Sequence, residues 1–209
     1  MATDDQLTDP RAFSIDGAID DNLPGEDCGR GLDDEEAADY PLAASFTAAG
    51  SFRRSRGERN VHRIVIHITD GQPNYQNTVC YFKNPTRNGE PLSVSAHYVV
   101  GQGGEVVQMV RNQDVAFHAG RANEHSIGIE HCARSAGEHG PGDPGFPVTE
   151  EQYLGSAYLV KWLCEQYELP LDRAHILGHA EADPTTTHTD CPAGCWDWDH
   201  YMGILTALK

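Results

Sequence analysis

The alternation of apolar and polar residues divides much of the chain into short segments that predict a β-sheet. Residues 61–68 form a β-branched and largely apolar run, which is typical of a central strand buried on both faces. Residues 93–100 and 106–111 predict two strands joined by the glycine-rich turn at 101–104, which is a good hairpin signal. Residues 126–131 predict a further short strand.

Helical spacing is found in three segments. Residues 74–82 predict a short helix and residues 198–205 a final one. Between them, Thr149-Glu150-Glu151-Gln152 forms a capping box that opens a helix ending near residue 169. Strands mixed with helices in this order predict an α/β fold, with a single mixed central β-sheet flanked by helices and no internal repeat. The core face of the long helix is expected to hold Leu154, Tyr158, Leu159, Trp162 and Leu163.

Charge is distributed unevenly along the 209 residues. The chain has 15 basic and 32 acidic residues, and this excess of acid argues against a nucleic-acid partner, which would need clustered basic residues. Residues 1–40 contain 13 of the acidic residues and two of the basic ones. We therefore predict an acidic N-terminal extension at 1–45 and a folded domain at 46–209. The extension is interpreted as a solvated arm, a partner-binding tail or an adaptation to high salt.

The sequence leaves the cellular location open. No apolar run approaches the ~20 residues that span a bilayer, and the first residues have neither the charge nor the apolar stretch of a secretory signal. A cytoplasmic enzyme and a protein delivered outside the cell by another route are both compatible with this pattern. The six cysteines do not decide the compartment either. Cys80 with Cys132 is one disulfide open to them, and Cys164 is expected to be a buried thiol.

Two histidines and one cysteine stand where loops follow predicted strands. His67 closes the apolar run, His179 follows Gly178 after a predicted strand at 175–177, and Cys191 precedes a proline. Each alone is more often a structural residue, and the chain has 11 histidines, most of which cannot be ligands. Together they form a His/His/Cys set. Three protein ligands with an open fourth position are typical of a catalytic zinc site, so we predict one Zn²⁺ per chain.

Six segments in a fixed order carry a family resemblance. The chain resembles the type 2 N-acetylmuramoyl-L-alanine amidases, a superfamily shared by phage amidases and peptidoglycan recognition proteins, over about residues 60–205. The segments are Ile64-Val65-Ile66-His67, Ser95-Ala96-His97-Tyr98-Val99-Val100, Ala116-Phe117-His118-Ala119-Gly120, Ser126-Ile127-Gly128-Ile129-Glu130, Gly178-His179, and Thr189-Asp190-Cys191-Pro192 followed by Trp196-Asp197-Trp198.

The resemblance implies roles for individual residues. The zinc ligands are His67, His179 and Cys191, and Glu130 is the catalytic carboxylate that takes a proton from water and passes it to the leaving amine. Of the remaining histidines, His118 is expected to line the substrate cleft or to be structural. His97 is grouped with it near the substrate, with a packed or supporting role as the alternative.

The chain departs from the family pattern at Ala96, where some phage members have a tyrosine, and near the last ligand. Many members have a lysine two positions before it; here that position is Thr189, and His188 one step earlier is a candidate catalytic residue that stabilises the oxyanion, or a loop residue. Relatives use either Asp or Cys before the proline. Asp190 would replace Cys191 as ligand if Cys191 were tied to Cys195 or another cysteine.

The implied reaction is hydrolysis of the amide between the lactyl group of N-acetylmuramic acid and L-alanine. The substrate is intact peptidoglycan or soluble muropeptides. The alternative is a non-catalytic module that binds peptidoglycan or muropeptides, which would have no reason to keep a full ligand set and Glu130. An antibacterial effector or lysin with an immunity or regulatory partner would use the same chemistry. A monomer without a transmembrane segment is expected.

Overall fold

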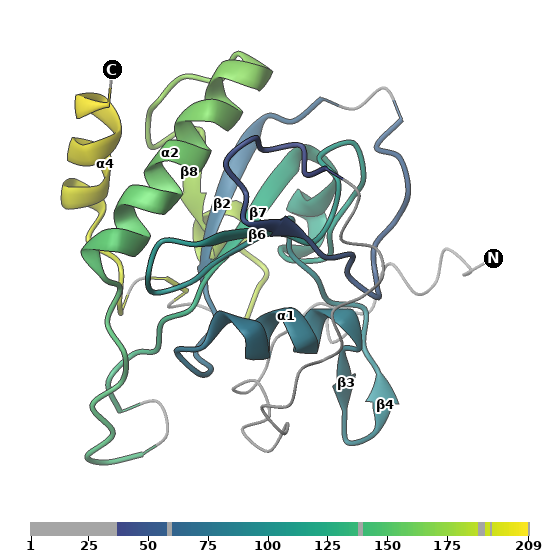
Figure 1. Cartoon of the computed structure of the whole chain (residues 1–209), viewed down its shortest axis with the longest axis vertical. Coiled ribbons are helices and arrows are strands. Elements are labelled where there is room, and N and C mark those ends of the chain that lie inside the picture. Colours follow the sequence, from purple (N-terminus) through teal and green to yellow (C-terminus); the bar gives the residue numbers. More distant parts are fainter. Residues whose placement is uncertain (1–36, 58–59, 138–139, 188–190, 193, 209) are drawn as a thin grey trace.

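The computed structural model describes residues 37–208 apart from 58–59, 138–139, 188–190 and 193. Within them a mixed six-stranded sheet runs in the order β1-β6-β5-β7-β2-β8, in which β5 and β6 are antiparallel and the other neighbours parallel (Figure 1). The strands are β1 (Ser45–Phe46), β2 (Arg63–Ile68), β5 (Tyr98–Val100), β6 (Val106–Gln108), β7 (Ser126–His131) and β8 (Ile176–Gly178). The predicted single mixed sheet is confirmed.

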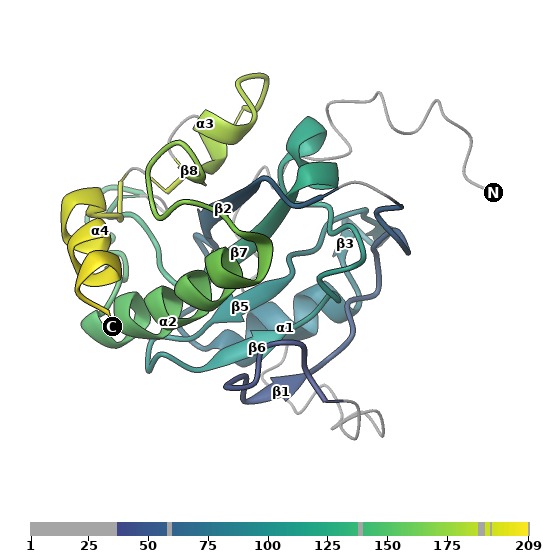
Figure 2. The ribbon, with the colours of Figure 1, turned by 90° about the horizontal axis from the view of Figure 1, so that it is seen from above.

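Helices cover both faces of this sheet. Figure 2 shows α2 and α4 side by side on one face, with α1 on the other. A 3₁₀ helix, η3, and the short α3 cover the rest of the α1 face. The bounds are α1 (Tyr75–Lys83), η3 (Gly120–His125), α2 (Glu150–Tyr167), α3 (His179–Ala182) and α4 (Trp198–Ala207), and β3 (Thr86–Arg87) pairs with β4 (Glu90–Pro91) as a separate hairpin.

The pleat of β2 sorts its side chains between the two faces. Ile64 and Ile66 are fully buried in the core formed with α2 and α4. Val65 points the other way, into a small cluster with η3 and α3, and His67 follows it because alternate residues of a strand share a face. Glu130 of β7 is the register partner of His67, so both side chains lie on the face opposite α2.

The long helix begins as its sequence predicts, and its buried face matches the predicted one in part. Thr149 accepts a hydrogen bond from the Gln152 backbone, and the Gln152 side chain accepts one from the Thr149 backbone, which confirms the capping box. The exposed fractions of Leu154 and Tyr158 are 39% and 52%, so their assignment to the core was wrong. Leu159 and Leu163 are fully buried, as predicted, and Trp162 packs against the same core. Tyr153, Ala157 and Val160 complete the buried face.

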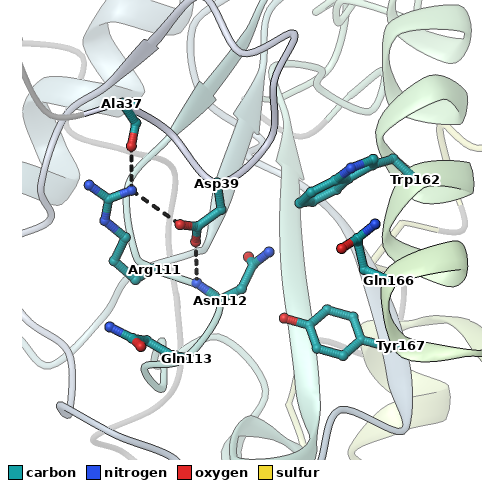
Figure 3. Close-up of a pocket in the computed structure, with 8 residues that line it drawn as sticks. All are labelled: Ala37, Asp39, Arg111, Asn112, Gln113, Trp162, Gln166 and Tyr167. Carbon is teal, nitrogen blue, oxygen red and sulfur yellow. Dashed lines mark hydrogen bonds and ion pairs between the residues drawn. The ribbon is translucent and has the colours of Figure 1, made fainter.

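The segment before β1 is bound to the body. The Asp39 carboxylate accepts hydrogen bonds from the Asn112 backbone at 2.8 Å and from Arg111 at 3.1 Å (Figure 3). With Trp162 and Tyr167 of α2, these residues help to line a cavity of about 680 Å³. Residues 37–45, which the sequence assigned to the extension, therefore lie against the sheet in the described structure.

The cysteines contradict the predicted disulfide and confirm the predicted thiol. Cys80 is in a disulfide, whereas Cys132 is a buried thiol, so the Cys80–Cys132 bridge was wrong. The Cys132 thiol lies 3.6 Å from the Thr78 hydroxyl. Cys164 is a buried thiol, as predicted. Among the described helices, none has the length and apolar character needed to cross a membrane.

Candidate metal centre

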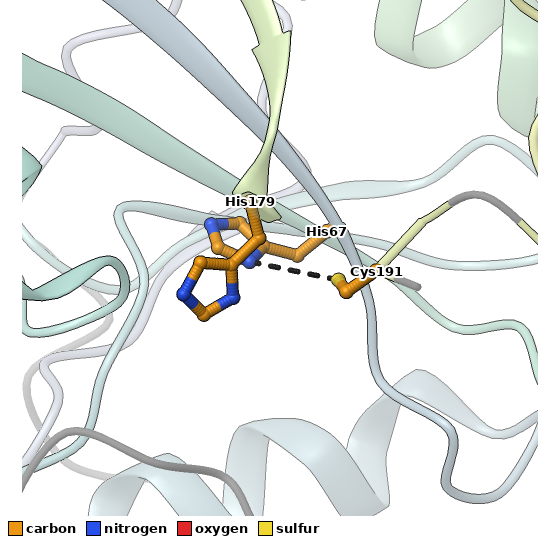
Figure 4. Close-up of side chains that lie close together, drawn as sticks. All are labelled: His67, His179 and Cys191. Carbon is orange, nitrogen blue, oxygen red and sulfur yellow. Dashed lines mark hydrogen bonds between the residues drawn. The ribbon is translucent and has the colours of Figure 1, made fainter. Parts of the chain in front are cut away.

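The sheet topology brings the three predicted ligands together. His67 lies near the carboxyl end of β2, and His179 follows β8 as the first residue of α3. These strands are parallel neighbours in which Ile66 pairs with Gly178, so their carboxyl ends meet. A loop brings Cys191 to the same point, and the ligand atoms of the three residues lie within 4.8 Å of one another (Figure 4). The set fits one metal ion in the donor types that zinc prefers.

The surroundings of Cys191 suit a ligating sulfur. Its Sγ lies 3.9 Å from Nδ1 of His67 and accepts a hydrogen bond from the Ile68 backbone at 3.5 Å. Gly178 permits the loop to approach, because a Cβ there would lie 2.7 Å from Cδ of Pro192. Cys191 and Cys195 are both thiols and not bridged, so the condition under which Asp190 would replace Cys191 is not met.

Glu130 is buried beside this cluster. Its exposed fraction is 1%, and neither carboxyl oxygen has a hydrogen-bond partner among the described residues. Burial raises the pKa of Glu130 well above its usual range, and the nearby Asp70 carboxylate raises it further. A carboxyl group buried in this way is costly unless a group outside the described residues pairs with it. A metal ion and a water molecule in the His/His/Cys site would supply such partners.

His118 contacts the ring of His67, a candidate ligand, rather than an open cleft. Its exposed fraction is 2%, its Nδ1 lies 3.0 Å from Nε2 of His67, and its Nε2 lies 3.1 Å from Oγ of Ser126. Burial lowers the pKa of His118 well below its usual value, with smaller effects from His179 and Arg56. The geometry supports the structural role that the sequence left open. Sequence reasoning missed Ser126 as part of the site, although it begins one of the matching segments.

His97 is packed within the protein and presents no surface to a substrate. It is 0% exposed; its Nδ1 accepts a hydrogen bond from the Gly128 backbone, and its Nε2 lies 2.6 Å from the Arg56 guanidinium. Burial and then Arg56 lower the pKa of His97 well below its usual value. We therefore assign His97 a supporting position, which was its alternative. Arg56 stands in the arginine-rich segment 53–59, whose charge suggests a solvated loop, but its exposed fraction is only 6%.

The remaining candidates near the last ligand are outside the described residues. These are His188, the candidate oxyanion residue, with Thr189 and Asp190 beside it. Their predicted roles stay predictions.

Comparison with known proteins identifies the family of the chain. The sequence profile of N-acetylmuramoyl-L-alanine amidases matches residues 57–194, the greater part of the chain. The chain belongs to the N-acetylmuramoyl-L-alanine amidase family. This confirms the predicted resemblance and the assignment as a hydrolase that acts on a carbon–nitrogen bond, and a non-catalytic module is not favoured. The family is generally zinc-dependent, and its activity implies a peptidoglycan substrate.

Individual relatives agree with this assignment. The chain is 26% identical over 179 residues to N-acetylmuramoyl-L-alanine amidase A of Achromobacter lyticus, covering 78% of this chain and 93% of the relative. It is 32% identical over 123 residues to the 1,6-anhydro-N-acetylmuramyl-L-alanine amidase AmpD of Enterobacter cloacae, covering 55% and 59% of the two chains. A crystal structure of an AmpD selenomethionine derivative aligns with a TM-score of 0.57 at 22% identity, over 81% of this chain and 99% of the other, and so shares the fold.

Proposed function

We propose that this amidase cuts the amide joining the lactyl group of N-acetylmuramic acid to L-alanine, with one zinc ion held by His67, His179 and Cys191. The observation that carries the proposal is the register of β2 and β7. It places the carboxyl group of Glu130 next to His67, on the face where the three ligand atoms converge. A base and a metal site side by side on one rigid sheet are what hydrolysis of an amide requires.

Each component of the site has a separate task. His67, His179 and Cys191 would hold the zinc, which would polarise the scissile carbonyl and make a water molecule in the site acidic enough to lose a proton near neutral pH. Glu130 takes that proton at one carboxyl oxygen while the water oxygen forms a bond to the carbonyl carbon. Glu130 then gives the proton to the nitrogen of L-alanine as the carbon–nitrogen bond breaks. The products are a lactyl carboxylate and a stem peptide with a free amino terminus.

Burial matches Glu130 to this task. A carboxyl group with an ordinary pKa would be a weak base at neutral pH, because it would hold a proton too loosely to accept one from water. In the zinc-free chain burial raises the pKa of Glu130, so its carboxyl group holds a proton more firmly than an exposed carboxyl group does. The low polarity that raises the pKa also keeps bulk water from competing for that proton.

Product analysis by mass spectrometry tests the proposed function. Zinc-loaded protein is incubated with purified sacculi and, separately, with soluble muropeptides. We expect free stem peptides that begin with L-alanine, and their yield shows which of the two substrates is preferred. Chelation and Glu130→Gln should each lower the rate by at least about 100-fold, since general acid–base catalysis contributes roughly 10²–10⁴-fold.

Glu90→Gln is the matched control for this substitution. It neutralises an exposed carboxylate in the β3–β4 hairpin and should leave the rate unchanged. Cleavage of neither substrate by protein that holds one zinc per chain would contradict the proposal and favour a binding module instead. A fully active Glu130→Gln variant would remove Glu130 from the reaction.

A further inference from the structure

We infer that His118 and Ser126 are positioning residues that fix the proton of His67 on Nε2, so that its Nδ1 presents a lone pair to the metal. A neutral imidazole exists in two tautomers, and only the nitrogen without a proton can ligate a metal. The inference rests on the proposed function, because it takes His67 as a zinc ligand. It adds that neighbouring residues select which ring nitrogen of His67 binds the metal.

The chain of hydrogen bonds starts at a backbone carbonyl oxygen. The carbonyl oxygen of Ala122 can only accept, and the Ser126 hydroxyl lies 2.7 Å from it and donates its single proton there. The Ser126 oxygen therefore has no proton left for His118, whose Nε2 lies 3.1 Å away. This contact is a hydrogen bond only if Nε2 of His118 carries the proton.

The same count of donors and acceptors applies to His118 and then to His67. The His118 ring is almost fully buried, and its two nitrogens contact Ser126 and His67, neither of which is an anion that would stabilise a second proton, so the ring carries one proton. With that proton on Nε2, Nδ1 of His118 accepts, and the donor 3.0 Å away is Nε2 of His67. Nδ1 of His67 is thereby left with its lone pair. This is the nitrogen that faces Sγ of Cys191 at 3.9 Å.

The backbone around His118 holds the ring in this orientation. The side-chain oxygen of Asn123 accepts hydrogen bonds from the backbone of His118 at 3.0 Å and of Ala119 at 2.6 Å. Gly128 of β7 lies under the ring, and a Cβ there would lie 2.4 Å from Cγ of His118. The segment from His118 through η3 to β7 is therefore shaped around one histidine that makes no contact with solvent.

A second histidine–serine pair in the protein provides a matched control. On the opposite face of the sheet, Nε2 of His131 lies 2.8 Å from Oγ of Ser156, and both residues are 0% exposed. That serine bonds onward to Tyr201, and Nδ1 of His131 contacts the backbone oxygen of His67 rather than its ring. Removing the Ser156 hydroxyl therefore deletes a similar buried bond without changing the partner of the His67 imidazole.

Nitrogen NMR of the zinc-free protein reads the tautomer directly. Spectra of protein labelled in the histidine rings distinguish a protonated ring nitrogen from one with a lone pair. We expect His67 to carry its proton on Nε2 in the wild type, and His118→Phe to lose this preference. A wild-type protein with the His67 proton on Nδ1 would overturn the inference. No zinc and no substrate are present, so the result is independent of whether the proposed reaction occurs.

Zinc affinity, measured by competition with a chelator, tests whether the His67 tautomer affects metal binding. His118→Phe keeps the ring volume without the acceptor, and should weaken zinc binding by about 10–100-fold, the effect typical of groups that orient a ligand. Ser126→Ala should also weaken zinc binding. His118→Asn should restore most of the affinity, because its amide oxygen stands near the position of Nδ1 and accepts from His67.

Three results would overturn the inference here. These are wild-type zinc affinity in His118→Phe, equal weakening in His118→Asn and His118→Phe, or equal weakening in Ser156→Ala and Ser126→Ala. The proposed function fails differently. It fails if the wild type binds zinc with His67 in the expected tautomer but cleaves neither substrate.

Discussion

Glu130 combines burial, a raised pKa and two oxygens without a hydrogen-bond partner among the described residues. Each buried polar group left without a partner costs about 1–3 kcal/mol of folding free energy. Among the described residues Glu130 therefore carries an energetic cost, which a bound metal ion and a water molecule would offset. This is the pattern expected where activity and stability make opposite demands on one side chain.

Replacing Glu130 by leucine should stabilise the zinc-free protein, and more so as pH rises. Because the folded-state pKa is raised, the wild type keeps its stability below the ordinary carboxyl value of 4.5 and loses it as pH rises through the folded-state pKa. Calorimetry at pH 5 and pH 8 should show a higher Tm for Glu130→Leu, by about 2–4 °C for each kcal/mol gained. An equal or lower Tm for the variant at pH 8 would contradict this.

The fit of α2 against the sheet depends on small residues along one side of the helix. Gly155 lies against the turn between β5 and β6, where a Cβ would lie 2.4 Å from the carbonyl oxygen of Gly104. The buried Gln152 side chain donates to the backbone oxygens of Val100 and Cys132, one from β5 and one just after β7. Helix and sheet are therefore joined by close approach and by polar contacts as well as by apolar packing.

Gly155→Ala should destabilise the protein although alanine is the better helix former. The helix propensity gain is about 1 kcal/mol, whereas overpacking against a backbone typically costs about 1–3 kcal/mol. Thermal unfolding should therefore show a lower Tm for Gly155→Ala. Gly203→Ala is the matched control in α4, because a Cβ there would meet nothing within 4 Å, and this variant should raise the Tm. A rise in both variants would show that α2 has room to shift.

Buried neutral histidines govern how the folded protein responds to acid. Burial lowers the pKa of His131 to about 4, and it lowers the pKa of His97 and of His118 well below the usual value. These rings stay neutral in the folded chain, whereas in the unfolded chain they bind protons below about pH 6.5. Stability is therefore complete above pH 6.5 and is lost as pH falls toward 4.

Urea unfolding of the zinc-free protein between pH 7 and 4.5 should show this loss. His131 alone accounts for about 3 kcal/mol by pH 4, since each pKa unit corresponds to about 1.4 kcal/mol. His131→Asn should flatten the dependence of the unfolding free energy on pH. The exposed His62→Asn is the control and should leave the slope unchanged. An unchanged slope in His131→Asn would mean that this ring is charged in the folded protein.

Local pattern determined the elements, and through them much of the fold. The run before His67, the hairpin at 101–104 and the Thr149 capping box were read from sequence, because side-chain periodicity and caps act between near neighbours. The core face of α2 was read only in part. Leu159 and Leu163 of the predicted stripe are buried, whereas Leu154 and Tyr158 are exposed, because tertiary packing sets which side of the helix meets the sheet.

The sequence by itself determined which residue types this protein offers for chemistry and the family to which it belongs. Only the tertiary structure decided that Glu130 lies beside His67, that His118 contacts the ring of His67, and that His97 is enclosed within the protein. These contacts join residues up to 63 positions apart in the chain. The physical reason is that strand register and the path of η3 set such contacts, and a shift of one residue in a strand would turn each side chain to the other face.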